Sequence, residues 1–404
     1  MQLPPPASPA IRTKSVLLIA GIVFVAFNLR APITSVGPLI DFIRSDMGIS
    51  NGFMGLLTTL PLLAFAILSP VAPSWGERFG GETAVMIGLV LIGAGILIRS
   101  AGLLFGLLAG TALIGFGIAL GNVLLPSVVK RRFPNHMGWM TGIYTSSMSL
   151  FASISSGISH PLAEHLHWGW QLSLAVWIVL CGIAILIWMP QLRGQSRASI
   201  SAVPARDRQS LLRSPIAWQV TLFMGLQSFL YYCMVAWLPA ILQQHGLSFA
   251  TAGWFLATMQ LTSIPVTLIT PVLADRLNDQ RAIVAGIGVL LAIGLYGLWF
   301  GGGLLLLTIC TVALGSALGA SISLALTLIG LRTKTDGQTA RLSGMAQSIG
   351  YLLAAIGPIT LGFLFDSFHS WVPALLLCIA VSLMMMAFGF GAGRNRYVLP
   401  AETN

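Results

Sequence analysis

Long apolar segments recur along the whole sequence and leave little chain between them. Twelve runs are each about as long as the 20 residues that a helix needs to cross a bilayer. Only 8% of the 404 residues are charged, against about 25% in an ordinary soluble domain. This shortage of polar surface excludes a soluble enzyme, a nucleic-acid-binding domain and a disordered chain. We predict an all-α membrane protein with twelve transmembrane helices, over 15–41, 52–74, 83–101, 103–128, 138–162, 168–189, 215–241, 249–273, 282–301, 303–329, 340–365 and 370–391.

Lysine and arginine fall almost entirely on one side of the predicted membrane. With the N-terminus placed inside, 18 of the 21 basic residues lie in inner loops or tails. Arg44 and Arg99 lie outside, and Arg30 lies within a span. Cytoplasmic loops carry such an excess of basic residues. We therefore expect both termini in the cytoplasm and a multi-pass protein of a bacterial inner membrane, and the net charge of +10 requires no nucleic-acid partner.

One polar stretch near the middle of the chain, rich in Arg and Ser, separates two groups of six predicted spans. It has the composition of a cytoplasmic linker. The predicted units are a cytoplasmic tail (1–14), an N-terminal six-helix bundle (15–190), the linker (191–214), a C-terminal six-helix bundle (215–392) and a second cytoplasmic tail (393–404).

The two predicted bundles share short sequence patterns. Pro-x3-acid-Arg follows the second span as Pro73 to Arg78 and the eighth as Pro271 to Arg276. A second pattern, (Thr/Ser)-Gly-x3-Ser, occurs in the fifth span from Thr141 and in the eleventh from Ser343. Both pairs are about 200 residues apart, close to half the chain. The patterns therefore predict two parallel six-helix repeats with pseudo-symmetry.

Twelve helices in two such halves, with acid-Arg loops after the second and eighth, resemble the major facilitator superfamily. The chain keeps Glu77-Arg78-x-Gly80 and Asp275-Arg276 of the superfamily's loop signature, but has proline for the first glycine and Gly81-Glu82 for a basic pair. The resemblance implies that Glu77, Arg78, Asp275 and Arg276 act in gating by closing the cytoplasmic side. We expect the first two to tie helix ends within the N-terminal half, and the other two to do so within the C-terminal half.

A narrower resemblance covers nearly the whole chain. Six short segments resemble the cyanate/nitroimidazole transporter (CynX/NimT) family. They are 28–32 (Asn-Leu-Arg-Ala-Pro), 37–39 (Gly-Pro-Leu), 121–126 (Gly-Asn-Val-Leu-Leu-Pro), 130–134 (Lys-Arg-Arg-Phe-Pro), 237–240 (Trp-Leu-Pro-Ala) and 343–351 (Ser-Gly-Met-Ala-Gln-Ser-Ile-Gly-Tyr). The second half, with Tyr231-Tyr232, is more similar to the nitroimidazole-exporter branch. The resemblance implies a small anion such as cyanate, or a polar heteroaromatic such as 2-nitroimidazole, and favours efflux.

Arg30 is the one basic residue that charge sorting leaves inside a span. It lies about 22 Å along the first predicted helix, within a hydrocarbon core of about 30 Å. A charge at that depth costs at least about 2.5–3.5 kcal/mol, so we expect it to face a cavity or a partner. Pro32 lacks the N–H that would bond the carbonyl of Asn28, so the helix should kink here. Arg30 is either a counter-charge for a solute or a structural cap for free carbonyls.

No Asp or Glu falls in the middle of a predicted span, so Arg30 has no carboxylate at its own depth. This argues against a buried carboxylate proton relay. Polar residues near mid-depth complete the candidate solute site, each either a solute contact or an interhelical hydrogen bond. The set lies on helices that line the cavity in the superfamily, and comprises Arg30, Asn28, Asn122, Tyr144, Ser147, Gln227, Tyr231, Gln260, Gln347 and Tyr351.

We therefore predict a monomeric secondary transporter working by alternating access, with a small-molecule solute and the lipid bilayer as its partners. A broader drug or metabolite efflux carrier and an anion channel are the alternatives. The sequence has no catalytic or cofactor fingerprint, so we expect no enzyme activity and no cofactor. His165 and His167 fit a solvated loop better than a metal site.

Overall fold

The computed structural model describes residues 9–49, 51–164, 166, 168–193 and 211–399. Most of the predicted linker lies outside these ranges, as do the ends of both predicted tails and the two loop histidines, His165 and His167. The boundaries of the predicted units therefore stay predictions.

Every regular element among the described residues is a helix. In chain order they are α1 (Pro9–Asn28), α2 (Ala31–Thr34), the 3-10 helix η1 (Gly37–Leu39), α3 (Ile40–Met47), α4 (Asn51–Leu68), α5 (Ala72–Phe79), α6 (Gly81–Arg99), α7 (Leu104–Arg132), the 3-10 helix η2 (Pro134–His136), α8 (Met137–Glu164), α9 (Gly169–Ala175), α10 (Trp177–Arg193), α12 (Pro215–Gln244), α13 (Phe249–Arg276), α14 (Arg281–Phe300), α15 (Leu304–Leu331), α16 (Asp336–Phe368) and α17 (Val372–Ala392).

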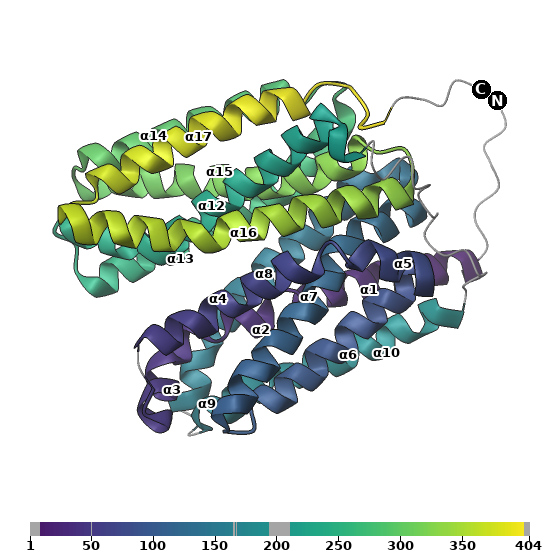
Figure 1. Ribbon diagram of the computed structural model, residues 1–404, viewed down its shortest axis with the longest axis horizontal. Helices are drawn as coiled ribbons and strands as arrows, with labels where there is room; N and C mark the ends of the chain where they lie inside the picture. The colour runs from purple at the N-terminus through teal and green to yellow at the C-terminus, as the bar shows by residue number, and fades with distance from the viewer. Residues whose placement is uncertain (1–8, 50, 165, 167, 194–210, 400–404) are drawn as a thin grey trace.

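Figure 1 shows these helices in two groups, α1–α10 and α12–α17. The groups approach each other toward the end at which α1 begins and α17 ends, and they lie apart at the opposite end. We call the first of these the closed end. It carries the basic segments, such as Lys130 to Arg132 and Arg341, so it is the end that charge sorting assigns to the cytoplasm.

Ten helical segments in the described part of the chain are long and apolar enough to cross a membrane. A bent pair, Thr59–Leu68 with Ala72–Phe79, makes an eleventh if it counts as one span. The predicted span 138–162 corresponds to α8, whose 28 residues are long enough to cross but include many serines. The predicted count of twelve therefore stays a prediction.

Three breaks in the helices fall where glycine and proline predicted them, whereas the predicted spans 52–74 and 168–189 are each divided into two helices that we did not predict. The hairpins between α6 and α7 and between α14 and α15 contain Gly102, Gly301 and Gly302, all with positive φ, a conformation that favours glycine. The first span breaks between Asn28 and Ala31, so that Arg30 sits outside regular helix with φ −128° and ψ −48°. The break exposes backbone groups at membrane depth, which is tolerated where a cavity or neighbouring side chains satisfy them.

Arg99 is a second buried cation. We placed it on the outer side, near the end of the predicted span 83–101. It is the last residue of α6, at the end away from the closed end, but it is only 1% exposed. Its Nη1 donates a hydrogen bond to the carbonyl oxygen of Pro32 at 2.6 Å. The broken first span leaves carbonyls facing the bundle interior, and a buried guanidinium can satisfy one of them. The N-terminal group therefore contains a second interior cation that charge counting placed outside.

Candidate functional site

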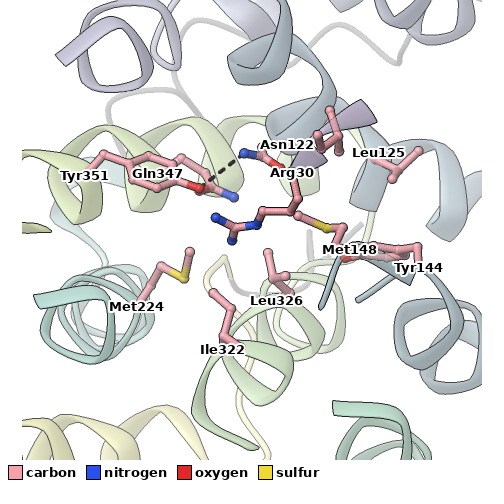
Figure 2. A pocket seen from close by; sticks show the side chains of 11 residues that line it. Arg30, Asn122, Leu125, Tyr144, Met148, Met224, Ile322, Leu326, Gln347 and Tyr351 are labelled. Atoms are coloured by element: carbon pink, nitrogen blue, oxygen red, sulfur yellow. Dashed lines mark hydrogen bonds between the residues drawn. The ribbon is translucent and has the colours of Figure 1, made fainter. Parts of the chain in front are cut away.

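The break in the first span places Arg30 at a small cavity between the two groups of helices (Figure 2). The cavity volume is about 10 Å³, enough for about one water molecule. Its lining comes from both groups and consists of Leu29, Arg30, Asn122, Leu125, Tyr144, Met148, Met224, Ile322, Leu326, Gln347 and Tyr351. Arg30, Asn122, Tyr144, Gln347 and Tyr351 all belong to the predicted solute site. A solute larger than water requires these walls to separate.

Arg30 reaches across to the C-terminal group. Its Nη1 lies 3.4 Å from the hydroxyl oxygen of Tyr232 on α12. The Tyr232 ring packs edge-on against Tyr231, whose hydroxyl donates to Oε1 of Gln260 at 3.1 Å. Tyr231 and Gln260 thus reach Arg30 through Tyr232, which we did not predict as a site residue. The sequence contains one indication of this role. Adjacent residues of a helix face different directions, so when Tyr231 points toward Gln260 its neighbour Tyr232 points elsewhere, here toward Arg30.

Asn122 and Tyr351 join the two groups beside the guanidinium. Nδ2 of Asn122 on α7 donates to the hydroxyl of Tyr351 on α16 at 3.2 Å (Figure 2). The ring of Tyr351 also packs on Phe65, with the centroids 4.6 Å apart. Oε1 of Gln347, one turn earlier on α16, is buried and has no hydrogen-bond partner among the described residues. An unpaired buried amide costs free energy, and a polar solute could recover it.

Three predicted residues lie away from this cavity. Asn28 is buried and donates to the carbonyl oxygens of Phe24 and Leu180, at 2.8 and 3.4 Å. Ser147 donates to the carbonyl of Ile143 in its own helix. Gln227 likewise bonds within α12, to Met224 and Ser228. The structure thus gives the donor groups of these three residues protein partners away from the cavity, while Oδ1 of Asn28 is buried without a partner among the described residues.

The cavity lining contains a cation but no carboxylate. Within the described ranges, no group of three or more His, Cys, Asp and Glu residues could hold a metal ion. The chemistry available at the cavity is therefore that of a guanidinium, two phenols, two amides and apolar walls. Such a set can bind a small anion or a polar ring through hydrogen bonds.

The acid-Arg loops correct a second expectation. We expected Glu77 to tie helix ends within its own half, but it accepts hydrogen bonds from Arg341 at the start of α16, in the other group. Asp275 also crosses, since its Oδ2 accepts from the backbone N–H of Gly138 on α8 at 3.2 Å. Arg78 lies over the neighbouring Phe79 ring, with 5.2 Å to the centroid, and Arg276 is exposed. Each carboxylate faces the opposite bundle because the loops meet at the closed end.

A lysine that we did not predict adds to this closure. Nζ of Lys130, near the end of α7, donates to the carbonyl oxygens of Gly330 and Thr333 at the end of α15. A cation is favourable at the C-terminus of a helix, where unsatisfied carbonyls gather. Ser127, one turn earlier, donates to the carbonyl oxygen of Asp336 at 2.9 Å. The closed end is thus held by contacts from α5, α7 and α8 to the other group.

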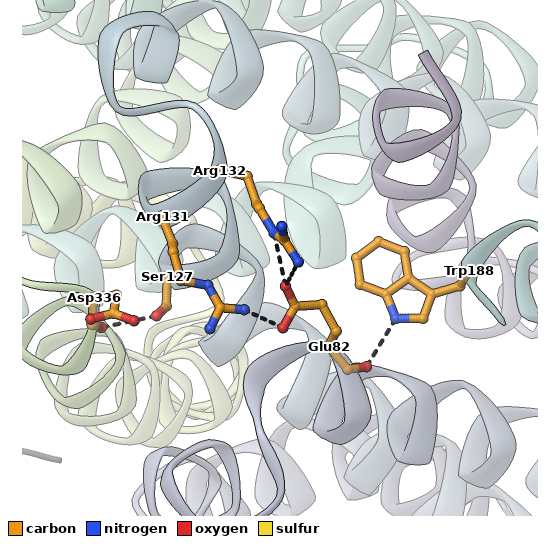
Figure 3. Close-up of polar contacts among 6 residues, drawn as sticks. All are labelled: Glu82, Ser127, Arg131, Arg132, Trp188 and Asp336. Atoms are coloured by element: carbon orange, nitrogen blue, oxygen red, sulfur yellow. Dashed lines mark hydrogen bonds and ion pairs between the residues drawn. The ribbon is translucent and has the colours of Figure 1, made fainter. Parts of the chain in front are cut away.

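The Glu82 that replaces a basic residue of the loop signature is fully buried in the N-terminal group (Figure 3). It accepts hydrogen bonds from Arg131 and from Arg132, the latter through Nε at 3.0 Å and Nη2 at 2.8 Å. Trp188 donates to its backbone carbonyl at 2.9 Å. The acid and the two arginines are thus positioned together where α6 begins and α7 ends. This departure from the signature has its own partners within the same bundle.

Comparison with known proteins identifies the family to which this architecture belongs. The family model of the Major Facilitator Superfamily matches residues 17–358, most of the chain. The chain belongs to the major facilitator superfamily. A relative in Bacillus subtilis (strain 168), described as an uncharacterized transporter YycB, is 51% identical over 97% of each chain.

Two further relatives support the narrower family, and a solved structure supports the fold. The 2-nitroimidazole transporter of Escherichia coli (strain K12) is 43% identical over 95% of this chain and 97% of its own. The cyanate transport protein CynX of the same organism is 30% identical over 92% and 97%. The structure of the proton:xylose symporter XylE bound to 6-bromo-6-deoxy-D-glucose superposes with a TM-score of 0.76, at 13% identity, over 95% of this chain and 97% of that one.

These similarities confirm the predicted superfamily, its all-helical fold and the CynX/NimT family. This superfamily member is a multi-pass secondary transporter of a bacterial inner membrane and not an enzyme. The cavity at Arg30 lies between its two helix groups, which is where transporters built from two repeats place their solute.

Proposed function

We propose that this transporter moves a small anion or a polar heteroaromatic solute, of the cyanate or 2-nitroimidazole type, by alternating access. The observation that carries the proposal is the Arg30 guanidinium at a cavity whose lining has no carboxylate. A cation without an acidic counterpart favours a solute that accepts hydrogen bonds. Cyanate is an anion, and a nitro group offers two acceptor oxygens to a planar guanidinium, so one arginine serves either solute.

The neighbouring groups support the heteroaromatic member of this solute class, because an amide oxygen accepts a hydrogen bond and a ring N–H can donate one, whereas cyanate has no donor. The unpaired Oε1 of Gln347 and the apolar side chains of Met148, Met224 and Ile322 border the cavity. A flat heteroaromatic ring would pack on the apolar walls while its polar edge meets the guanidinium and the amide. The names of the relatives at 43% and 30% identity, a 2-nitroimidazole transporter and a cyanate transport protein, agree with this class.

Entry and release follow from the positions of the two groups. The cavity holds about one water, so the groups must move apart to admit a solute. They are in contact at the closed end through Glu77, Asp275 and Lys130. We propose that these contacts break when the solute passes to that side, and that the opposite end closes in turn.

Binding and counterflow in proteoliposomes test the proposal. Wild-type protein should bind 2-nitroimidazole or cyanate, and preloaded vesicles should show trans-stimulated uptake. Arg30→Ala should abolish saturable binding, and Arg30→Lys should weaken it about tenfold or more, because lysine keeps the charge but loses the planar fork. Arg281→Ala, which removes an exposed cation, is the matched control.

Unchanged affinity in both Arg30 variants would overturn the role of Arg30. Flux without trans-stimulation would indicate an anion channel. Binding of many unrelated drugs with equal affinity, insensitive to Arg30, would indicate a broad efflux carrier.

A further inference from the structure

The repeated pattern (Thr/Ser)-Gly-x3-Ser lies at both interfaces between the bundles. In α8 it runs from Thr141 to Ser146 and faces α13. In α16 it runs from Ser343 to Ser348 and faces α4. The pattern indicates duplication, and in the structure both copies contact the opposite bundle at equivalent places.

Each copy directs a serine hydroxyl at a backbone carbonyl of the opposite bundle. Ser348 Oγ donates to the carbonyl oxygen of Ala66 at 2.6 Å. Ser146 Oγ lies 3.4 Å from the carbonyl oxygen of Ile264 and 3.1 Å from the hydroxyl of Thr267. Ala66 and Ile264 are separated by about 200 residues, as are the two serines. The two contacts are therefore copies of one interaction, related by the internal repeat.

Proline explains why a carbonyl is available at each interface. Pro70 has no N–H, so the carbonyl of Ala66 four residues earlier loses its helical donor. Pro271 frees the carbonyl of Thr267 in the same way. Oγ1 of Thr145, beside Ser146, lies 3.2 Å from that carbonyl oxygen, as well as 2.7 Å from the carbonyl of Thr141 in its own helix. The hydroxyls of Ser348 and Thr145 thus lie at carbonyls of the opposite bundle, those of Ala66 and Thr267, that lack a backbone hydrogen-bond donor within their own helix.

Glycine lets the backbones approach closely enough for these bonds. A Cβ added at Gly344 would lie 2.7 Å from the carbonyl oxygen of Ser69, and one added at Gly142 would lie 2.6 Å from that of Leu268. Real Cβ atoms do not come that close to a carbonyl oxygen. Both glycines therefore fit the closed arrangement, whereas a side chain at either position requires the bundles to separate.

The two contacts lie between the cavity and the ionic contacts of the closed end. Along α16, Arg341, Gly344, Ser348 and Tyr351 follow one another on a single face, and contact Glu77, Ser69, Ala66 and Asn122 in that order. Opening this end would separate the hydroxyls from the carbonyls and let water satisfy both. The bonds are therefore made in only one of the two states of the transporter.

We propose that Ser348 with Ala66, and Ser146 with Ile264, form a symmetric pair of latches that hold the bundles closed at this end. Their glycines set the approach distance. Pro70 frees the acceptor of Ser348, whereas the carbonyl of Ile264 also accepts from Thr267 in its own helix, and Pro271 frees the neighbouring carbonyl that Thr145 contacts. The latches set the conformational equilibrium of the empty transporter, since each bond favours the closed state alone. The inference uses the proposed alternating access but not the proposed solute.

Distance measurements on the empty transporter test the latches. Nitroxide labels on Ser74→Cys in α5 and Leu277→Cys after α13 report the separation at the closed end, and the four native cysteines are buried. Ser348→Ala should raise the ratio of open to closed molecules about threefold to tenfold, the effect of one hydrogen bond. Ser146→Ala should give a smaller rise because its contact is longer, and the double variant should combine both. Gly344→Ala should give a larger rise than either.

Two variants control for the substitutions themselves. Ser382→Ala removes a buried hydroxyl that bonds within α17, and Gly286→Ala adds a Cβ where no atom lies within 4 Å. Both should leave the distance distribution unchanged. The proposal is overturned if the serine variants match Ser382→Ala, whatever the folding of Gly344→Ala. Because no solute is present, this outcome is separate from failure of the Arg30 hypothesis.

Discussion

Glu77 on α5 accepts two hydrogen bonds from Arg341 on α16, at 2.9 Å from Nε and 2.6 Å from Nη2. The side chains are 12% and 15% exposed, so solvent screens the pair only partly. The contact joins the two bundles of the transporter at their closed end. Because it breaks when that end opens, its free energy biases the conformational equilibrium and not only the stability of the fold.

Reversing one charge of this pair should open the closed end. Glu77→Arg places two cations together and removes an interaction of about 1.5–3 kcal/mol, so the open fraction should rise tenfold or more. Combining it with Arg341→Glu should restore most of the closed fraction, because the pair is rebuilt in the opposite sense. Single-molecule energy transfer between labelled positions 74 and 277 measures that fraction. A swapped pair that stays as open as the single variant would contradict the assignment.

Arg99 should hold the broken first span in position. Its Nη1 donates to the carbonyl oxygen of Pro32, two residues from Arg30. Arg99→Met should speed amide hydrogen exchange over residues 31–36 about tenfold or more, since the carbonyl loses a charge-assisted donor. Arg99→Lys, which keeps one donor, should retain most of the protection. Equal exchange in the Met variant and the wild type would refute this role.

Glu82 should contribute to stability far more than an exposed acid. It is fully buried, while Arg131 and Arg132 are 23% and 35% exposed, so losing its charge should cost less than the loss of a fully buried pair, about 3–5 kcal/mol, but more than the loss of an exposed pair. Glu82→Gln should therefore lower the thermal unfolding temperature by several degrees. Asp279→Asn in the exposed pair with Arg281 is the control and should leave it unchanged. A Glu82→Gln protein as stable as the control variant would show that the buried cluster adds nothing.

Substitution of the two buried glutamines, Gln347 and Gln227, should affect different properties: the first should lower solute affinity and the second should lower stability. Gln347→Leu removes an amide whose Oε1 has no partner, so stability should hold or rise while solute affinity falls about fivefold to tenfold. Gln227→Leu removes an amide that bonds Met224 and Ser228, so stability should fall while affinity is kept. Calorimetry and thermal unfolding of both variants measure the two effects. The opposite pattern would place the solute against α12 at Gln227.

Several features could be predicted because they depend on the chemistry of short segments. Apolar length predicted the helices, and glycine predicted the hairpins at 102 and 301–303. The missing N–H of Pro32 predicted a kink at the place where the first span breaks beside Arg30. Resemblance of short motifs gave the superfamily and the CynX/NimT family, which the relatives confirm. Arg30 stood out because an unpaired charge at that depth is costly wherever the rest of the chain lies.

Partners could not be predicted in the same way. Glu77 and Asp275 were expected to bond within their own halves, but in the folded chain each meets the opposite bundle. Arg99 was counted as an outer charge because it ends an apolar run, although it folds inward to Pro32. A hydropathy pattern records how deep a residue lies along a helix, but not which neighbour it faces.

The sequence by itself determined the class of protein, the family, the broken first helix and the isolated charge of Arg30, because these follow from residue type and local backbone chemistry. Only the tertiary structure decided that Tyr232 meets Arg30, that Lys130 caps α15, and that Ser348 reaches a carbonyl freed by Pro70. These contacts join residues about 200 or more positions apart. They exist because two bundles pack with one particular rotation and spacing, a relationship that no single segment encodes.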